Sequence, residues 1–126
     1  MDKTVLSDTY KNDGRSLIDA LAKEHFKIDA AMWFYSKESE EWRLLIATPL
    51  VGRLGPKNTY KRIQSVLAKL EKLGISISLR DITVLRPIDP LINTIMDSVR
   101  YQKETIIKDT VLNSVQMDDA YIYFIA

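Results

Sequence analysis

The sequence predicts a single α+β domain over residues 1–126, with a mostly antiparallel sheet of about five strands packed with three helices in the order α-β-β-α-β-α-β-β. Three observations support this fold class. Segments rich in aromatic and branched residues occur in pairs joined by polar turns, three segments carry apolar residues at helical spacing, and no linker or repeat divides the chain. Because strand pairs outnumber strand–helix–strand connections, an antiparallel sheet with helices beside it is the natural arrangement.

The first predicted element is a helix over 14–26, preceded by an extended arm over 1–12. The side chain of Asp13 can accept hydrogen bonds from the free amides of a first helical turn. Leu21 and His25 lie four residues apart and therefore share one helix face. We expect His25, the only histidine of the chain, to be buried or half-buried with a structural partner rather than to act as a general base.

A hairpin is predicted from residues 29–36 and 41–48, which are rich in aromatic and branched side chains and are joined by four polar residues. Both strands carry apolar residues on both faces, so we expect them to lie centrally in the sheet with a layer on each side. Trp33, Tyr35 and Trp42 could stack on nucleic-acid bases if they were exposed. Rings on a central hairpin are usually core, and we predict that these rings are core.

A second helix is expected to begin at Pro56, since proline suits the first helical position, and to end at Gly74. Residues 75–84 alternate between apolar and polar side chains, but the phase of the alternation slips by one residue at Arg80 and Asp81. This pattern predicts a strand pair interrupted by a bulge or a short turn.

The third helix is predicted to begin at Asp89 and Pro90, an aspartate cap followed by a proline, and to continue to about residue 102. The remaining sequence predicts two strands, over about 105–112 and 119–125. Asparagine, serine and aspartate residues between these two strands are typical of turns.

Composition excludes several classes of function. The chain has no cysteine and one histidine, which removes disulfides, thiol catalysis and the usual transition-metal ligand sets, so we predict no cofactor. The N-terminal residues lack the apolar segment of a signal peptide, and no apolar run reaches the about 18 residues of a membrane span. We therefore expect a cytoplasmic protein that does not act at a membrane.

No catalytic motif is complete in the sequence. Residues 52–59 lie between a strand and a helix, as a phosphate loop does, but their glycine spacing is wrong and a proline removes an amide that such a loop uses. No lysine has an acidic residue two positions before it, which removes the signature of one class of metal-dependent nuclease. A carboxylate-bound metal would require Asp29, Asp81 and Asp89 to converge in the fold. We interpret the acidic residues within 38–41 as a solvated hairpin turn.

The charge of the chain is unevenly distributed. Residues 1–52 carry 7 basic and 9 acidic side chains, residues 53–86 carry 8 and 2, and residues 87–126 carry 3 and 6. Cations on the outer face of the second predicted helix, and in the loop before it, could neutralise phosphates. These possible polyanion-binding residues are Arg53, Lys57, Lys61, Arg62, Lys69 and Lys72. The alternative is that they serve solubility and pair with carboxylates of the acidic flanks.

The last predicted strand is uncharged from residue 120 to residue 126, and Tyr121 and Tyr123 alternate onto one of its faces. At a free sheet edge such a strand would be open to aggregation, so it must be internal or covered by a second copy or a partner protein. We predict a two-fold dimer with Tyr121 and Tyr123 at the contact.

The missing catalytic set and the uncharged C-terminal strand together predict a small non-enzymatic interaction or regulatory module. Such a module acts through protein–protein contacts, here as a homodimer or with a protein partner. The alternative function is nucleic-acid or polyanion binding through the basic helix 53–72.

Overall fold

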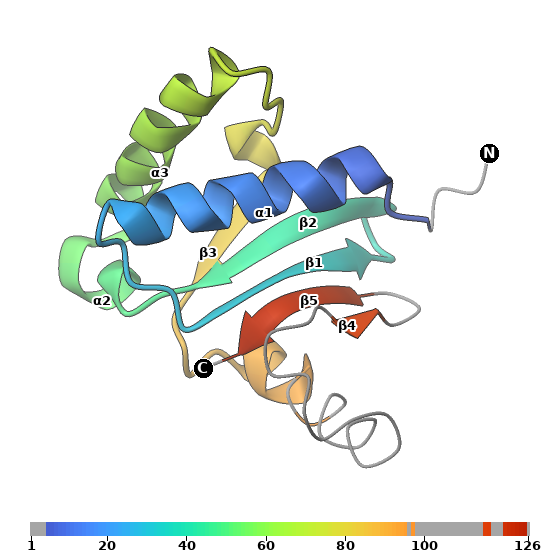
Figure 1. The fold of residues 1–126 in the computed structure, drawn as a ribbon. Helices are drawn as coiled ribbons and strands as arrows, with labels where there is room; N and C mark the ends of the chain where they lie inside the picture. The colour runs from blue at the N-terminus through green and yellow to red at the C-terminus, as the bar shows by residue number, and fades with distance from the viewer. Residues whose placement is uncertain (1–4, 96, 98–114, 117–119, 126) are drawn as a thin grey trace.

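The computed structural model describes residues 5–95, 97, 115–116 and 120–125 and contains one mixed sheet in the order β3-β2-β1-β5-β4 (Figure 1). The strands are β1 (Ala30–Ser36), β2 (Glu41–Ala47), β3 (Ile82–Leu85), β4 (Val115–Gln116) and β5 (Ala120–Ile125). The helices are α1 (Asp8–Lys23), α2 (Leu50–Leu54), α3 (Pro56–Glu71) and the 3-10 turn η1 (Leu79–Asp81), and a further helical segment begins at residue 90. The predicted α+β class is confirmed. The predicted strand over 105–112 and the end of the predicted third helix lie outside the described residues.

The predicted hairpin is confirmed in β1 and β2, which pair from Ala30 opposite Ala47 to Ser36 opposite Glu41. Both strands are central, because β3 lies beyond β2 and β5 lies beyond β1. The ring of Trp33 is buried, and the half-buried Trp42 and Tyr35 meet edge-on. The prediction that the hairpin rings belong to the core is therefore correct for Trp33 and holds in part for the other two.

The strand predicted over 75–84 is shorter than expected and is paired differently. It begins only at Ile82, as β3, and runs parallel to β2. Before it, Ser78 Oγ accepts a hydrogen bond from the amide of Arg80, and the Asp81 carboxylate accepts one from the amide of Ser78, each at 3.4 Å. The slip in polarity thus marks a short turn, the second of the two predicted alternatives, in the form of a capped 3-10 turn. Along the chain, α2 and α3 lie between β2 and β3, and the connection is therefore a crossover of the kind that joins parallel strands.

The first helix begins earlier than predicted. Its cap is Ser7 and not Asp13, since Ser7 Oγ accepts a hydrogen bond from the amide of Tyr10 at 3.2 Å. Residues 8–12 are consequently helical, and the predicted extended arm is wrong for them.

Asp13 and His25 also take positions that the sequence did not predict. Asp13 is buried within α1, and its carboxylate accepts a hydrogen bond from the amide of Ser76 at 3.2 Å. His25 is exposed and has φ 62°, because α1 already ends at Lys23 and the chain turns there through a conformation that favours glycine. The expected burial of His25 is therefore wrong.

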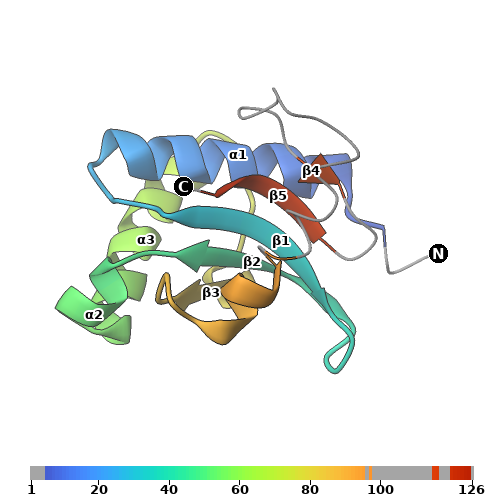
Figure 2. The same cartoon turned by 90° about the horizontal axis from the view of Figure 1, so that it is seen from below.

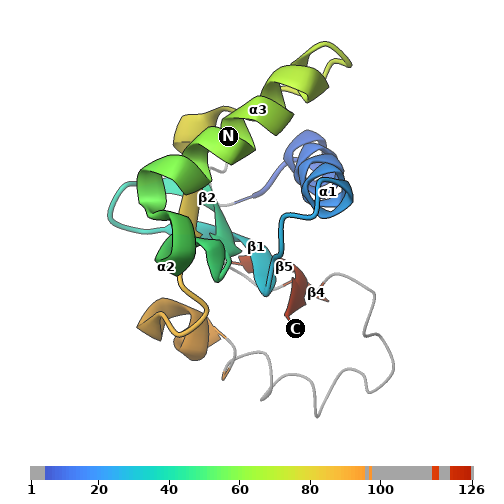
Figure 3. The ribbon, with the colours of Figure 1, turned by 90° about the vertical axis from the view of Figure 1, so that its left-hand side faces the viewer.

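Helices cover both faces of the sheet (Figures 2 and 3). α1 and α3 pack against one face, where Leu21 and Ile63 join a single buried cluster. The helical segment that begins at residue 90, drawn in orange, covers the other face through Ile92. Asp89 caps this segment as predicted, because its Oδ1 accepts a hydrogen bond from the amide of Leu91 at 2.9 Å.

A buried hydrogen-bond network joins β1 and β5 to α1. Trp33 Nε1 donates to the Tyr123 hydroxyl at 3.0 Å, and this hydroxyl donates to the carbonyl of Lys11 at 2.6 Å. Burial raises the pKa of Tyr123 well above its ordinary value, so the hydroxyl keeps the proton that it donates. Gly14 of α1 faces the same hydroxyl and has no side chain to obstruct it.

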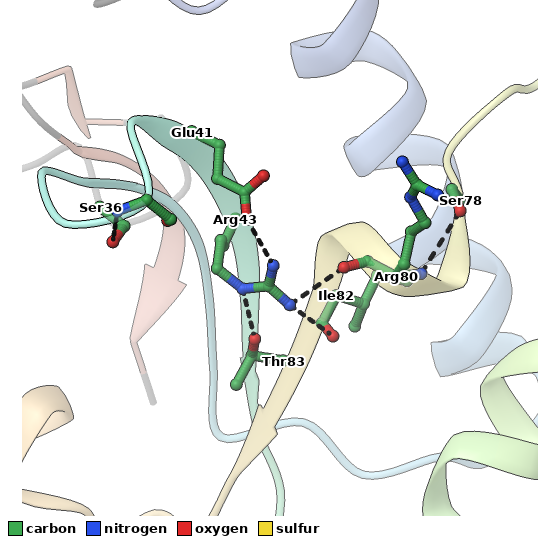
Figure 4. A network of polar contacts seen from close by, with 8 residues as sticks. Ser36, Glu41, Arg43, Ser78, Arg80, Ile82 and Thr83 are labelled. Carbon is green, nitrogen blue, oxygen red and sulfur yellow. Dashed lines mark hydrogen bonds and ion pairs between the residues drawn. The ribbon is translucent and has the colours of Figure 1, made fainter.

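Arg43 ties β2 to β3 and to η1 (Figure 4). Its Nε donates to Thr83 Oγ1 at 2.8 Å, and its Nη2 donates to the carbonyl of Arg80 at 3.0 Å. Its Nη1 completes the fork with an exposed ion pair to Glu41 at 3.1 Å. A planar guanidinium is required to reach all of these acceptors at once.

We expect Arg43→Lys to lower the free energy of unfolding by about 1–2 kcal/mol, because an ammonium cannot make the bonds to β3 and η1 together. Glu41→Gln is the control, since it removes only the exposed ion pair and should cost less than about 0.5 kcal/mol. Urea unfolding followed by tryptophan fluorescence measures both changes. Equal losses in the two variants would show that the contacts to β3 and η1 contribute nothing.

Candidate functional site

The predicted basic helix is α3, which lies beside α1 on the outside of the molecule (Figure 3). Gly55 turns the chain with φ 82°, and Pro56 then occupies the first helical position. Ile63 and Leu70 anchor the buried face of the helix. The hydroxyl of Tyr60 accepts a hydrogen bond from the amide of Val84 at 3.1 Å, which holds α3 against the edge strand β3.

The six predicted cations separate into two groups around α3. At about 100° per residue, Lys57, Lys61 and Lys72 project from the side opposite the buried face. All three are exposed, and we refer to them as the outer basic stripe. Arg53 is exposed in α2, immediately before the stripe. Arg62 and Lys69 project instead toward the C-terminal end of α1.

The two groups differ in how their charge is compensated. Lys69 Nζ lies 3.5 Å from a carboxylate oxygen of Glu24, and the Arg62 guanidinium lies over the ring of Phe26 at 5.6 Å. Within the described part of the chain, no ion pair forms at Arg53 or at any lysine of the outer basic stripe. The alternative prediction, that the acidic flanks neutralise the basic helix, therefore applies to Lys69 and not to the stripe.

A groove of about 450 Å³ lies between α3 and residues 75–79, and we refer to it as the α3 groove. Gln64, Leu67, Ala68 and Glu71 form its helical wall. Its other wall includes the half-buried side chains of Ile75 and Leu79. Gln64 and Ala68 lie one turn from Lys61 and Lys72 along the helix, so the groove runs alongside the outer basic stripe.

The α3 groove was not predicted from the sequence, because residues 75–79 were assigned to a strand of the sheet. Two features of the sequence could have indicated it. Ser78 followed three residues later by Asp81 is a pattern of reciprocal capping, which marks a turn rather than a strand. Ala68 is a small apolar residue among the polar side chains of the exposed helix surface.

The described residues contain no group of three histidine, cysteine, aspartate or glutamate side chains that could hold a metal ion. Asp81 accepts the capping bond of η1 and Asp89 caps the helical segment after it, so both carboxylates already have structural roles. The predicted alternative of a metal site built from Asp29, Asp81 and Asp89 therefore has no support in the described part of the structure. In that same part, no helix combines the length and apolar character that a membrane crossing needs.

The two tyrosines predicted at a dimer contact lie on β5, which is flanked by β1 and β4. Tyr123 is 2% exposed and is hydrogen-bonded within its own chain, so it has no surface to offer to a second copy. Tyr121 is half-buried, and Lys11 Nζ lies 5.0 Å from the centre of its ring. The expected contact is therefore wrong for Tyr123. A homodimer, and a contact at Tyr121, stay predictions.

No protein-family model matches the chain, and no curated protein or solved structure is significantly similar to it. Among the described residues, the outer basic stripe and the α3 groove are features that favour binding.

Proposed function

We propose that the protein is a non-enzymatic interaction module that binds an acidic segment of a partner protein on the outer basic stripe of α3. The observation that carries this proposal is the uncompensated charge of the stripe. Its three lysines and the nearby Arg53 are exposed and form no ion pair within the described residues. Unpaired cations of one sign attract an acidic partner, accelerate the encounter and set its orientation.

The charge balance of the surrounding chain strengthens this field. Residues 53–86 carry 8 basic and 2 acidic side chains. Of the two acids, Asp81 is engaged in the cap of η1 and Glu71 lies in the wall of the α3 groove. Exposed ion pairs contribute little individually, about 0.2–1 kcal/mol, so several of them must act together to bind a partner.

Nucleic acid is the second candidate partner, and one further observation favours it. The first amides of α3 receive no hydrogen bond from a capping side chain. These amides form the positive end of the helix dipole, which lies beside Arg53 and Lys57 and adds to their attraction for a phosphate. About four phosphate contacts give weak, strongly salt-dependent binding, with log K falling about 3–4 units per tenfold increase in salt. We rank this partner second because phosphates would use the charge of this surface and not its apolar groove.

We expect the double substitution Lys57→Glu with Lys61→Glu to weaken the binding of short glutamate-rich peptides by about tenfold or more at low salt, because two attractions become repulsions. Fluorescence anisotropy with labelled peptides measures the effect. Lys23→Glu with Lys27→Glu is the matched control, since both lysines are exposed, lie outside the stripe and change the net charge equally.

Three outcomes are decisive. Loss of binding in the stripe variant alone supports the proposal. Equal losses in both double variants would mean that net charge, and not this surface, drives binding. If single-stranded or duplex oligonucleotides bind in preference to all acidic peptides, the second candidate replaces the first.

A further inference from the structure

We propose that the partner segment is amphipathic as well as acidic: its apolar side chains enter the α3 groove while its carboxylates meet the outer basic stripe. This inference rests on the proposed function, because it specifies the chemistry of the partner that the stripe attracts. The outer basic stripe and the α3 groove, which lie one helical turn apart on α3, would then form a single binding surface.

The size and the walls of the groove suit protein side chains. Its volume of about 450 Å³ falls within the range of about 300–1,000 Å³ that is typical of binding clefts. Leu67, Ala68, Ile75 and Leu79 supply apolar wall surface, and Leu67 and Leu79 also pack against the core of the fold, which holds the groove in shape. The groove opens to solvent, so it suits the side chains of a segment that passes over it better than a small molecule that must be enclosed.

The charges around the groove indicate the kind of segment. Lys61 and Lys72 lie one turn from Gln64 and Ala68 of the helical wall, so carboxylates on the outer side of a bound segment would meet them. Glu71 is the one carboxylate among the lining residues. It would repel a phosphate backbone that followed the groove, whereas an apolar side chain placed there avoids this repulsion. Charge complementarity thus favours an acidic protein segment over a nucleic acid.

A helical segment has a suitable form for this surface. If it presents apolar residues at i, i+3 and i+4, it could cover the groove with one face and direct its carboxylates to the stripe. Leu73, 77% exposed after the last turn of α3, is not among the residues that line the groove.

Two substitutions fill the groove and leave the charges of the stripe unchanged. Ala68→Gln adds a neutral side chain to the helical wall, at an exposed position of α3. Ser76→Gln does so from the opposite wall and keeps the backbone amide that binds Asp13. Ala22→Gln in α1 is the matched control, because it makes the same change at an exposed helical alanine that does not line the groove.

The probes are two synthetic peptides with the same number of glutamates. The first carries leucines at helical spacing, and the second has serine at every leucine position. We expect the native protein to bind the leucine peptide about tenfold more tightly than the serine peptide, since only the first can bury apolar surface in the groove. Ala68→Gln and Ser76→Gln should each remove this preference and leave the serine peptide unaffected, and Ala22→Gln should change neither.

The two peptides distinguish a failure of this inference from a failure of the proposed function. If both peptides bind with equal affinity and the groove variants change nothing, the groove has no part in binding and the inference is overturned, while the basic stripe stands. If neither peptide binds, both proposals fail together. An oligonucleotide that displaces the leucine peptide and binds the Ala68→Gln variant normally would also overturn the inference, because it would identify a partner that uses charge alone.

Discussion

Gly14→Ala is expected to lower the free energy of unfolding by about 3 kcal/mol. A Cβ at this position would lie 2.8 Å from Trp33 Nε1 and 3.0 Å from Tyr123 Cζ, and closer still to the Tyr123 hydroxyl oxygen. These are ring atoms in the packed core, so either α1 must move away from the sheet or the hydrogen bond between the rings must break. Alanine gains about 1 kcal/mol over glycine in helix propensity, which is smaller than this cost. Urea unfolding measures the difference.

Gly52→Ala is the matched control for this prediction. Gly52 also lies in a helix, but a Cβ there would meet nothing within 4 Å. Its stability should be unchanged or up to about 1 kcal/mol higher, because only the gain in helix propensity remains. A Gly14→Ala protein as stable as the native chain would mean that α1 is free to move away from the sheet.

Tyr123→Phe is expected to lower the free energy of unfolding by about 2 kcal/mol. The substitution keeps the ring but removes the acceptor of the Trp33 indole N–H, which then stays buried without a partner. Tyr121→Phe is the control, since Tyr121 is only half-buried and its hydroxyl forms no hydrogen bond within the described residues. Thermal or urea unfolding of the two variants gives the comparison. Similar losses in the two variants would show that the hydrogen bond between Trp33 and the Tyr123 hydroxyl adds no stability of its own.

The effects of Gly14→Ala and Tyr123→Phe on the free energy of unfolding should also be coupled. Once Tyr123→Phe has removed the oxygen nearest to the new Cβ, Gly14→Ala becomes less costly, so the double variant should be more stable than the sum of the single changes implies. A coupling of about 1 kcal/mol would locate the clash at the hydroxyl. Strict additivity would place it at Trp33 instead.

Local sequence patterns predicted several elements correctly. The hairpin of β1 and β2, the start of α3 at Pro56 and the cap at Asp89 each depend on residues within one or two turns of one another. The excess of basic over acidic side chains between residues 53 and 86 was likewise visible in the sequence, and it identified the helix that carries the outer basic stripe. Capping, proline geometry and hairpin turns act over a few residues, which is why a single sequence contains them.

Long-range packing decided the roles of other residues. Asp13 has the side chain of a helix cap, yet its partner is Ser76, 63 residues away, because Ser7 occupies the capping position first. Tyr123 lies in an uncharged strand that was expected to be internal or covered by a partner, and it bonds to Trp33, 90 residues away, because β5 pairs with β1 and places its ring beside α1. Neither partner can be inferred from the local sequence, since each depends on which elements lie side by side.

The candidate site divides in the same way. The sequence by itself determined that α3 is basic on one side and apolar on the other, because both properties follow from residue type and helical period. The tertiary structure decided which cations pair with a carboxylate within the described residues, since the end of α1 reaches Lys69 and not the outer basic stripe. It also created the α3 groove, because the capped turn before β3 keeps residues 75–79 out of the sheet and leaves them facing the helix. The order of residues gives the charge and the helical period of α3. Ion pairing and the volume of a groove depend instead on which elements lie side by side in the folded chain.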